Sequence, residues 1–154
     1  MIKNSNPARN TVCQLTETII LCDNPNVQAS GTLTMISTVL VVEDDETLRS
    51  LTMDAISLLG LRVIGCASAD DALDILDGPS SIDLVMTDIC MPGTLDGLEL
   101  AQVIVARSPG LPIIVTSGNR PLPDGLLPSH VIFLRKPWTL DFLHQTIKSY
   151  MTAH

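Results

Sequence analysis

The sequence predicts an α/β fold, a doubly wound five-stranded parallel sheet with helices on both faces. Two observations predict it. Short runs rich in valine, isoleucine and leucine recur from residue 38 onward, and helix-length segments separate most of them. These runs are almost continuously apolar, which is typical of parallel strands buried on both faces. The expected strands cover residues 39–42, 61–66, 82–87, 112–116 and 131–134.

The first expected helix joins the first two strands. One of its faces repeats at the i, i+3, i+4 and i+7 spacing of an amphipathic helix, and Gly60 supplies a C-terminal stop. That face consists of Leu48, Leu51, Thr52, Ala55, Ile56 and Leu59. We therefore expect these six residues to pack on the sheet.

Three further helices follow from their apolar spacing and their caps. Ser68 is a suitable N-cap for the second helix, which carries Ala72, Leu73, Ile75 and Leu76. The third helix carries Leu98, Ala101, Ile104 and Val105. Thr139 is the expected N-cap of the last helix, whose stripe at i, i+4 and i+8 is Leu143, Ile147 and Met151.

The alternation of strands and helices breaks between the fourth and fifth strands. Residues 117–130 contain three prolines and two glycines where a helix is due. Each proline inside a helix costs about 3 kcal/mol, because its ring clashes with the preceding turn and it lacks an N–H donor. We expect the fourth helix of the pattern to be degraded or replaced by a proline-rich loop.

The N-terminal part of the chain differs in composition from the rest. Residues 1–36 are mostly polar, contain one short apolar patch and lack periodicity, so we expect a flexible or weakly ordered extension before a domain at residues 37–152. Met35 immediately precedes that domain and is an alternative translation start.

Composition excludes several classes of function. The formal net charge is −8 without a cluster of lysine or arginine, so direct binding of nucleic acid is not expected. The four cysteines have no zinc-binding spacing, and we interpret them as reduced thiols of a cytoplasmic protein. The apolar run at residues 18–22 is far shorter than the roughly 20 residues of a membrane span, so no membrane association is expected.

Polar side chains lie at the carboxyl ends of four of the five expected strands. In strand order they are Glu43 and Asp44, then Asp88, then Thr116, then Lys136. Alone, each has an ordinary explanation as a helix cap, a turn residue or a strand residue. Ligands of doubly wound sheets bind at this edge, because the loops splay apart there. Four such residues at successive ends therefore indicate one shared site.

These residue types suit phosphoryl transfer. Clustered carboxylates repel one another unless a cation lies among them, and Mg²⁺ is the expected ion because it prefers oxygen ligands and retains several waters. Asp88 can serve as ligand and as nucleophile, since a carboxylate accepts a phosphoryl group to form an acyl phosphate. Thr116 can donate a hydrogen bond to one phosphoryl oxygen, and Lys136 can neutralise another.

Four segments also carry a resemblance to a known family, and they read VLVVEDDE, DLVMTDICMPG, PIIVTSG and FLRKPW. Over residues 38 to 151 they resemble the receiver domain of bacterial two-component response regulators. The resemblance implies a flavodoxin-like receiver fold in which Asp88 accepts a phosphoryl group from a sensor histidine kinase or a histidine phosphotransfer protein. It further implies that Mg²⁺ is held by Glu43, Asp44, Asp88 and the backbone carbonyl of Cys90.

The resemblance also assigns residues that respond to phosphorylation. Thr116 and Lys136 match the switch hydroxyl and the lysine of the family, and Phe133 falls where the family places its switch aromatic. Ordinary core packing explains Phe133 equally well, and Trp138 fits a packing anchor better than a ligand contact. Cys90 and Gly118 offer no carboxylate or amide to orient an attacking water, so hydrolysis of the acyl phosphate would depend on the metal and on solvent access.

We expect a stand-alone receiver that acts through protein contacts, through phosphorelay or as a phosphate sink. The sequence does not identify its downstream target, and it leaves open whether the protein forms a homodimer. We hypothesise that the loop at residues 117–130 orders upon phosphorylation. No enzymatic activity is expected beyond the protein's own phosphorylation and dephosphorylation. The alternatives are a partner-binding pseudo-receiver and a Mg²⁺-dependent hydrolase of the haloacid-dehalogenase type, which would need a second acid where Cys90 stands.

Overall fold

The computed structural model of the chain describes residues 36–118, 127–128 and 130–151. Nine elements follow one another: β1 (Thr38–Val42), α1 (Glu46–Ser57), β2 (Arg62–Cys66), α2 (Ala69–Leu76), β3 (Leu84–Asp88), α3 (Gly97–Arg107), β4 (Ile113–Ser117), β5 (Val131–Arg135) and α4 (Leu140–Met151). Residues 1–35 of the expected extension and most of the expected loop at 117–130 lie outside the described residues, so both expectations stay predictions. None of the described helices is long and apolar enough to cross a membrane.

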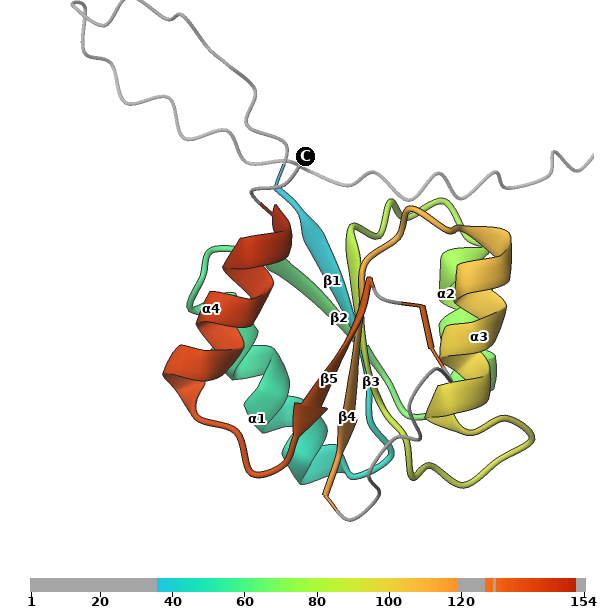
Figure 1. The fold of residues 1–154 in the computed structure, drawn as a ribbon, viewed down its shortest axis with the longest axis horizontal. Helices are drawn as coiled ribbons and strands as arrows, with labels where there is room; N and C mark the ends of the chain where they lie inside the picture. The colour runs from blue at the N-terminus through green and yellow to red at the C-terminus, as the bar shows by residue number, and fades with distance from the viewer. Residues whose placement is uncertain (1–35, 119–126, 129, 152–154) are drawn as a thin grey trace, which may run out of the picture. The chain divides into compact units, whose positions relative to one another are not determined.

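The five strands form one parallel sheet in the order β2-β1-β3-β4-β5. Helices α1 and α4 cover one face, and α2 and α3 cover the other (Figure 1). The three central strands are buried along their full length, whereas the edge strands β2 and β5 are partly exposed. The predicted doubly wound parallel sheet is therefore confirmed.

The predicted ends of the strands and the two predicted N-caps agree closely with the structure. Each strand begins and ends within two residues of its predicted bounds, and Asp88 is the last residue of β3. The Ser68 hydroxyl accepts a hydrogen bond from the Asp71 amide at 3.1 Å, and the Thr139 hydroxyl accepts one from the Phe142 amide at 3.2 Å. Both predicted N-caps are thus present.

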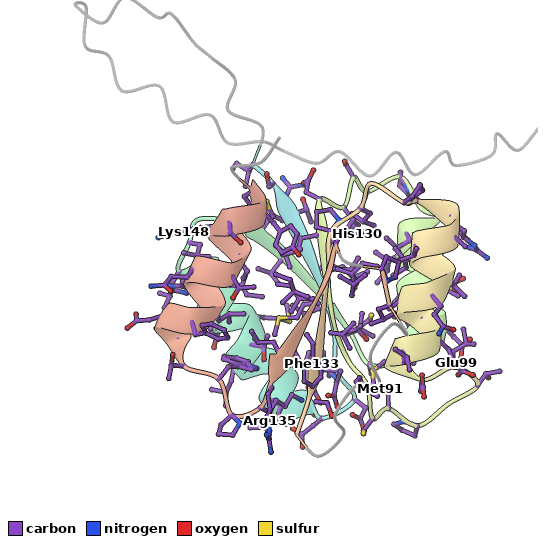
Figure 2. The ribbon with its side chains drawn as sticks, viewed as in Figure 1. Met91, Glu99, His130, Phe133, Arg135 and Lys148 are labelled. Carbon is purple, nitrogen blue, oxygen red and sulfur yellow. The ribbon has the colours of Figure 1, made fainter. Side chains whose placement is uncertain are left out.

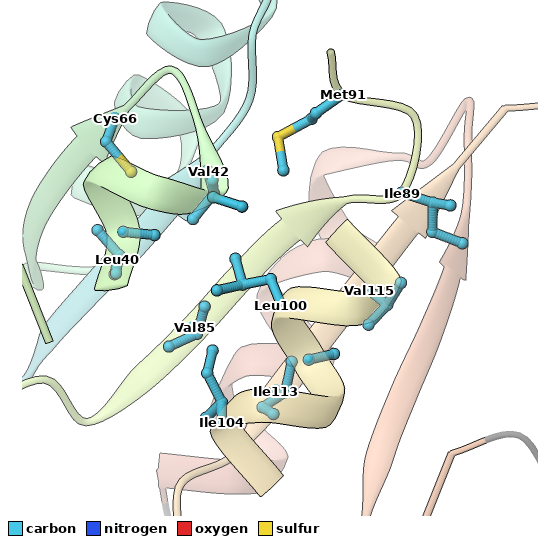
Figure 3. Close-up of a cluster of buried hydrophobic side chains, with 13 residues drawn as sticks. Leu40, Val42, Cys66, Val85, Ile89, Met91, Leu100, Ile104, Ile113 and Val115 are labelled. Atoms are coloured by element: carbon cyan, nitrogen blue, oxygen red, sulfur yellow. The ribbon is translucent and has the colours of Figure 1, made fainter. Parts of the chain in front are cut away.

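Each face of the sheet has its own apolar core, because successive side chains of a strand point to opposite faces. The α2–α3 core is shown in Figure 3 and includes Leu40, Val42, Val85, Leu100, Ile104, Ile113 and Val115. The α1–α4 core includes Val39, Val41, Ile56, Met86, Ile114, Leu134, Leu143 and Ile147. The predicted stripe of the last helix therefore does face the sheet.

One expectation about α1 is wrong. Leu48 and Leu51 do not pack on the sheet, since their exposed fractions are 45% and 60%. Thr52 and Ile56 are the buried residues of this helix. The first turns of α1 lie next to the carboxyl edge, where Leu48 and Leu51 line a groove together with Pro137, Trp138 and Leu140. Amphipathic spacing identified an apolar face, but part of that face borders the groove.

Candidate functional site

The predicted residues at the carboxyl edge come together in the structure. Lys136 is central, because its Nζ lies 2.7 Å from Glu43 Oε2 and 3.2 Å from Asp88 Oδ1. The hydroxyl of Thr116 donates to Asp88 Oδ1 at 3.4 Å, and the two residues are register partners on β3 and β4. The strand order brings the ends of β1, β3, β4 and β5 side by side, which is why residues far apart in sequence meet here.

Three carboxylates form a cluster that can hold a metal ion. Glu43, Asp44 and Asp88 each offer an oxygen, and these oxygens lie within 4.8 Å of one another. Glu43 and Asp88 are buried and Asp44 is exposed, so the cluster opens to solvent on one side. The backbone carbonyl of Cys90 has no described contact, and its role as a metal ligand stays a prediction. The Cys90 side chain is exposed.

The charges at this edge favour a divalent cation. When all groups are ionised, three negative charges and the one positive charge of Lys136 leave a net charge of two negative units. Burial raises the pKa of Glu43, although the hydrogen bond and charge of Lys136 oppose that shift. Burial also acts to lower the pKa of Lys136, but Glu43 and Asp88 together raise it above its usual value. An oxygen-only donor set with excess negative charge fits Mg²⁺.

Gly97, the first residue of α3, allows this helix to start directly against the backbone of Asp88, the candidate phosphoacceptor. The Gly97 amide donates to the Ile89 carbonyl at 3.1 Å, and a Cβ at Gly97 would lie only 1.7 Å from the Asp88 carbonyl oxygen. Helix α3 can therefore begin directly against the backbone of Asp88 only with glycine here. Asp96 and Glu99 form a capping box that fixes this start. Sequence reasoning did not identify Gly97 as part of the site. The signal that could have found it is its position between the capping acid Asp96 and the apolar stripe of α3.

The turn after Asp88 directs the chain out of the site. Met91 is buried in the α2–α3 core, and its amide donates to the Ile89 carbonyl at 3.1 Å. Gly93 has a φ of 137°, a backbone conformation that residues with a Cβ rarely adopt. Figure 3 shows Met91 pointing toward the core residues Val42 and Leu100. The Met-Pro-Gly turn is thus anchored by its methionine.

Two further predicted residues lie beside the cluster. Phe133 is half-buried on β5 and packs against the α2–α3 core (Figure 2), so packing accounts for its position while its switch role stays a prediction. Trp138 packs against the α1–α4 core, as expected of an anchor. It also lines a cavity of about 10 Å³ with Glu43, Asp88 and Lys136.

Sequence reasoning also missed Arg49, on the first turns of α1. Its Nη1 donates to the backbone carbonyl of Glu43 at 2.7 Å and to that of Asp44 at 3.4 Å. An arginine six residues after the first acid is the only trace of this contact in the sequence. The side chain returns from the helix to the segment that carries the acidic pair.

The sheet order and the cluster of acids, threonine and lysine define a flavodoxin-like α/β protein with a ligand site at the carboxyl edge of the sheet. The family model described as the response regulator receiver domain matches residues 39–148. The chain therefore belongs to the receiver domain family of response regulators.

Individual relatives agree with this assignment. The C4-dicarboxylate transport transcriptional regulatory protein DctD of Rhizobium meliloti is 34% identical over 113 aligned positions, and the match covers 71% of this chain and 24% of DctD. A response regulator receiver protein from Sinorhizobium medicae is 26% identical with a TM-score of 0.67, and the match covers 77% of this chain and 96% of that one. The chain thus spans about a quarter of the curated relative DctD.

A third similar protein was solved with a metal. The response regulator protein TrrA from Thermotoga maritima, in complex with Mg²⁺ and BeF, is 26% identical with a TM-score of 0.68. The match covers 75% of this chain and 99% of that chain.

Proposed function

We propose that this protein is a phosphorylation-controlled signalling receiver. Asp88 accepts a phosphoryl group from the phosphohistidine of a sensor histidine kinase or a histidine phosphotransfer protein. The observation that carries the proposal is the bridge formed by Lys136, whose Nζ contacts both Glu43 and Asp88. One cation therefore lies beside the carboxylate that would accept the phosphoryl group, and this supports a role in neutralising the charge of that group.

The transfer is a single displacement at phosphorus. An oxygen of the Asp88 carboxylate attacks, the N–P bond of the phosphohistidine breaks, and its electron pair returns to the imidazole nitrogen. The other ring nitrogen of the phosphohistidine carries a proton, so the donor leaves as a neutral imidazole and the product is an acyl phosphate on Asp88. Lys136 neutralises one phosphoryl oxygen and the Thr116 hydroxyl donates to another, so both interactions grow stronger as charge accumulates on these oxygens.

The carboxylates of Glu43, Asp44 and Asp88 would hold Mg²⁺, with the carbonyl of Cys90 as a further ligand by resemblance to the family. When bound, the ion supplies positive charge next to the transferred phosphoryl group. The excess negative charge of the cluster supports this proposal, and so does the Mg²⁺ complex of the related TrrA. Asp44 is exposed, so the ion has access from solvent.

The donor would dock on the α1–α4 side. The groove beside Glu43 and Lys136 has a volume of about 680 Å³. Leu48, Leu51 and Leu140 line it and are exposed. A donor must bring its phosphohistidine to Asp88, and a helix with apolar residues around that histidine would cover this surface. The proposal also includes output through protein contacts or phosphorelay.

We further propose that the protein has no enzymatic activity on a separate substrate and that it resides in the cytoplasm. The free thiols of Cys66 and Cys90 support that location. A hydrolase of the haloacid-dehalogenase type is the less favoured alternative, since the position two residues after Asp88 is an exposed cysteine. Turnover of a small phosphoester such as p-nitrophenyl phosphate would distinguish the two functions.

Incubation with acetyl phosphate and Mg²⁺, followed by intact mass measurement, tests the proposal. The wild-type protein is expected to gain one phosphoryl group, and the Asp88→Asn variant is expected to gain none. EDTA is expected to abolish the gain. An unmodified wild type would instead indicate a pseudo-receiver that only binds a partner, and equal modification of the variant would show that Asp88 is not the acceptor.

A further inference from the structure

We infer that Arg49 is a positioning residue. It fixes the backbone of the acidic pair, Glu43 and Asp44, and thereby raises the affinity of the site for Mg²⁺. The inference rests on the proposed function, because it concerns the same metal cluster. Its basis is the pair of contacts from Arg49 Nη1 to the carbonyl oxygens of Glu43 and Asp44, at 2.7 Å and 3.4 Å.

The segment that carries the acidic pair is held at two further points. The Glu43 amide donates to the Cys66 carbonyl of β2 at 3.1 Å. The Asp45 carboxylate accepts from the Leu48 amide at 2.8 Å as the N-cap of α1. Neither of these bonds involves the Glu43 or Asp44 carbonyl, so among the described contacts only Arg49 fixes those two groups.

Asp44 depends most on this contact. Its side chain is exposed, and in the described part of the chain it makes no hydrogen bond or ion pair of its own. Its carboxylate is therefore positioned by its backbone alone. A hydrogen bond from a charged guanidinium is stronger than one between neutral groups, so the Arg49 contact is well suited to hold that backbone.

The structure also leaves room for the Arg49 side chain. A Cβ at Gly65 would lie 3.4 Å from Arg49 Cδ and 2.4 Å from the sulfur of Met53. The aliphatic part of the Arg49 side chain therefore runs beside Gly65 of β2 on its way to the end of β1. The Arg49 amide donates to the Asp45 carbonyl at 2.8 Å, which ties the arginine to the first turn of α1.

A positioning role and a bystander role predict opposite effects on metal binding. A bystander arginine would only add a positive charge near the site, so removing it would strengthen Mg²⁺ binding. A positioning arginine stabilises the ligand geometry, so removing it would weaken Mg²⁺ binding. Loss of an interaction that orients metal ligands typically lowers affinity about 10-fold to 100-fold.

The test compares three variants of the full chain. Arg49→Gln removes the charge and both contacts, Arg49→Lys keeps the charge without the planar fork of donors, and Arg62→Gln removes an exposed arginine from the start of β2 as a charge-matched control. Isothermal titration calorimetry gives the Kd for Mg²⁺. Hydrogen exchange in EDTA reports on the amides of residues 43–45.

We expect the Kd of Arg49→Gln to rise about 10-fold, the Kd of Arg49→Lys to lie between that value and the wild-type value, and Arg62→Gln to match the wild type. Exchange of the amides of residues 43–45 should become faster in Arg49→Gln while exchange in β3 and β4 stays unchanged. An unchanged or lower Kd in Arg49→Gln would overturn the inference.

If Arg49→Gln does not fold, Arg49→Lys decides the question, and a Kd equal to that of the wild type would overturn the inference. A wild-type protein that fails to bind Mg²⁺ would instead refute the proposed function. The two failures are therefore distinguishable.

Discussion

On the α2–α3 face of the sheet, the large apolar side chains of α3 are buried or half-buried. On the α1–α4 face, several large apolar side chains of the helices are exposed. Leu100 and Ile104 of α3 are almost fully buried. By contrast, Leu51 of α1 and Phe142 of α4 remain more than half exposed. The α2–α3 face also holds Asp88 in place through Gly97, while the α1–α4 face borders the groove beside Lys136. One face therefore supports the site, and the other offers a surface next to it.

The largest expected effect, a loss of both stability and phosphorylation, concerns the supporting face. Gly97→Ala would place a Cβ against the Asp88 carbonyl, so α3 or β3 must shift. We expect a loss of about 3 kcal/mol in the free energy of unfolding, with loss of phosphorylation by acetyl phosphate. Gly110→Ala is the matched control, because no atom lies within 4 Å of a Cβ at that position. Equal unfolding midpoints in urea for both variants would contradict this explanation.

A pair of leucine variants compares the two faces directly. Leu100→Ala removes a fully buried side chain from α3 and should cost roughly 2–5 kcal/mol. Leu51→Ala removes an exposed one from α1 and should cost less than about 0.5 kcal/mol. If a donor docks in the groove, Leu51→Ala should slow phosphotransfer from the donor protein while phosphorylation by acetyl phosphate stays normal. A large loss of stability in Leu51→Ala would remove the contrast between the faces.

The helix caps offer a finer comparison. The Asp96 carboxylate accepts from the amides of Leu98 and Glu99 within a capping box, whereas Asp45 accepts from one amide. We expect Asp96→Ala to cost about 2 kcal/mol and Asp45→Ala about 1 kcal/mol. Urea unfolding in EDTA measures both without a contribution from metal binding. The reverse order would show that the start of α3 is not the more firmly held of the two.

The last expected effect is a pH dependence of the stability, which arises in the α2–α3 core. Burial raises the pKa of the Cys66 thiol to about 11 from its ordinary value of 9.0. Between these values the unfolded chain releases a proton that the folded chain retains, so the free energy of unfolding falls as pH rises. The expected loss is roughly 1 kcal/mol between pH 9 and pH 10. Cys66→Ala should remove this part of the slope, and an unaltered slope would show that the thiol does not contribute.

Much of the fold was predictable because the strands are short, apolar and buried on both faces. The ends of the strands also gave the position of the site, since in a parallel sheet the order of the strands determines which ends are neighbours. The resemblance to receivers added the roles of Asp88 and Lys136. The structure places both residues as expected, and their roles still require the experiments described above.

The features that were missed depend on contacts that a linear pattern does not contain. Apolar spacing on α1 cannot show whether Leu48 faces the sheet or a groove, because both environments favour leucine. The need for Gly97 arises from the carbonyl of Asp88, which belongs to another element. Arg49 contacts backbone atoms, and any residue at positions 43 and 44 would provide those carbonyl groups.

Lys136 lies directly after the edge strand β5, so its contacts with Glu43 and Asp88 depend on how firmly β5 is held in the sheet. The Lys136 amide donates to the Ser117 carbonyl at 2.9 Å, and the Tyr150 hydroxyl donates to the His130 carbonyl at 2.9 Å, so β5 is attached at both ends. Any fluctuation that detaches β5 also withdraws the cation from Glu43 and Asp88 and leaves their charges uncompensated. Fraying of this edge is therefore disfavoured beyond its own hydrogen bonds, and the chemical site and the sheet edge open as one cooperative unit.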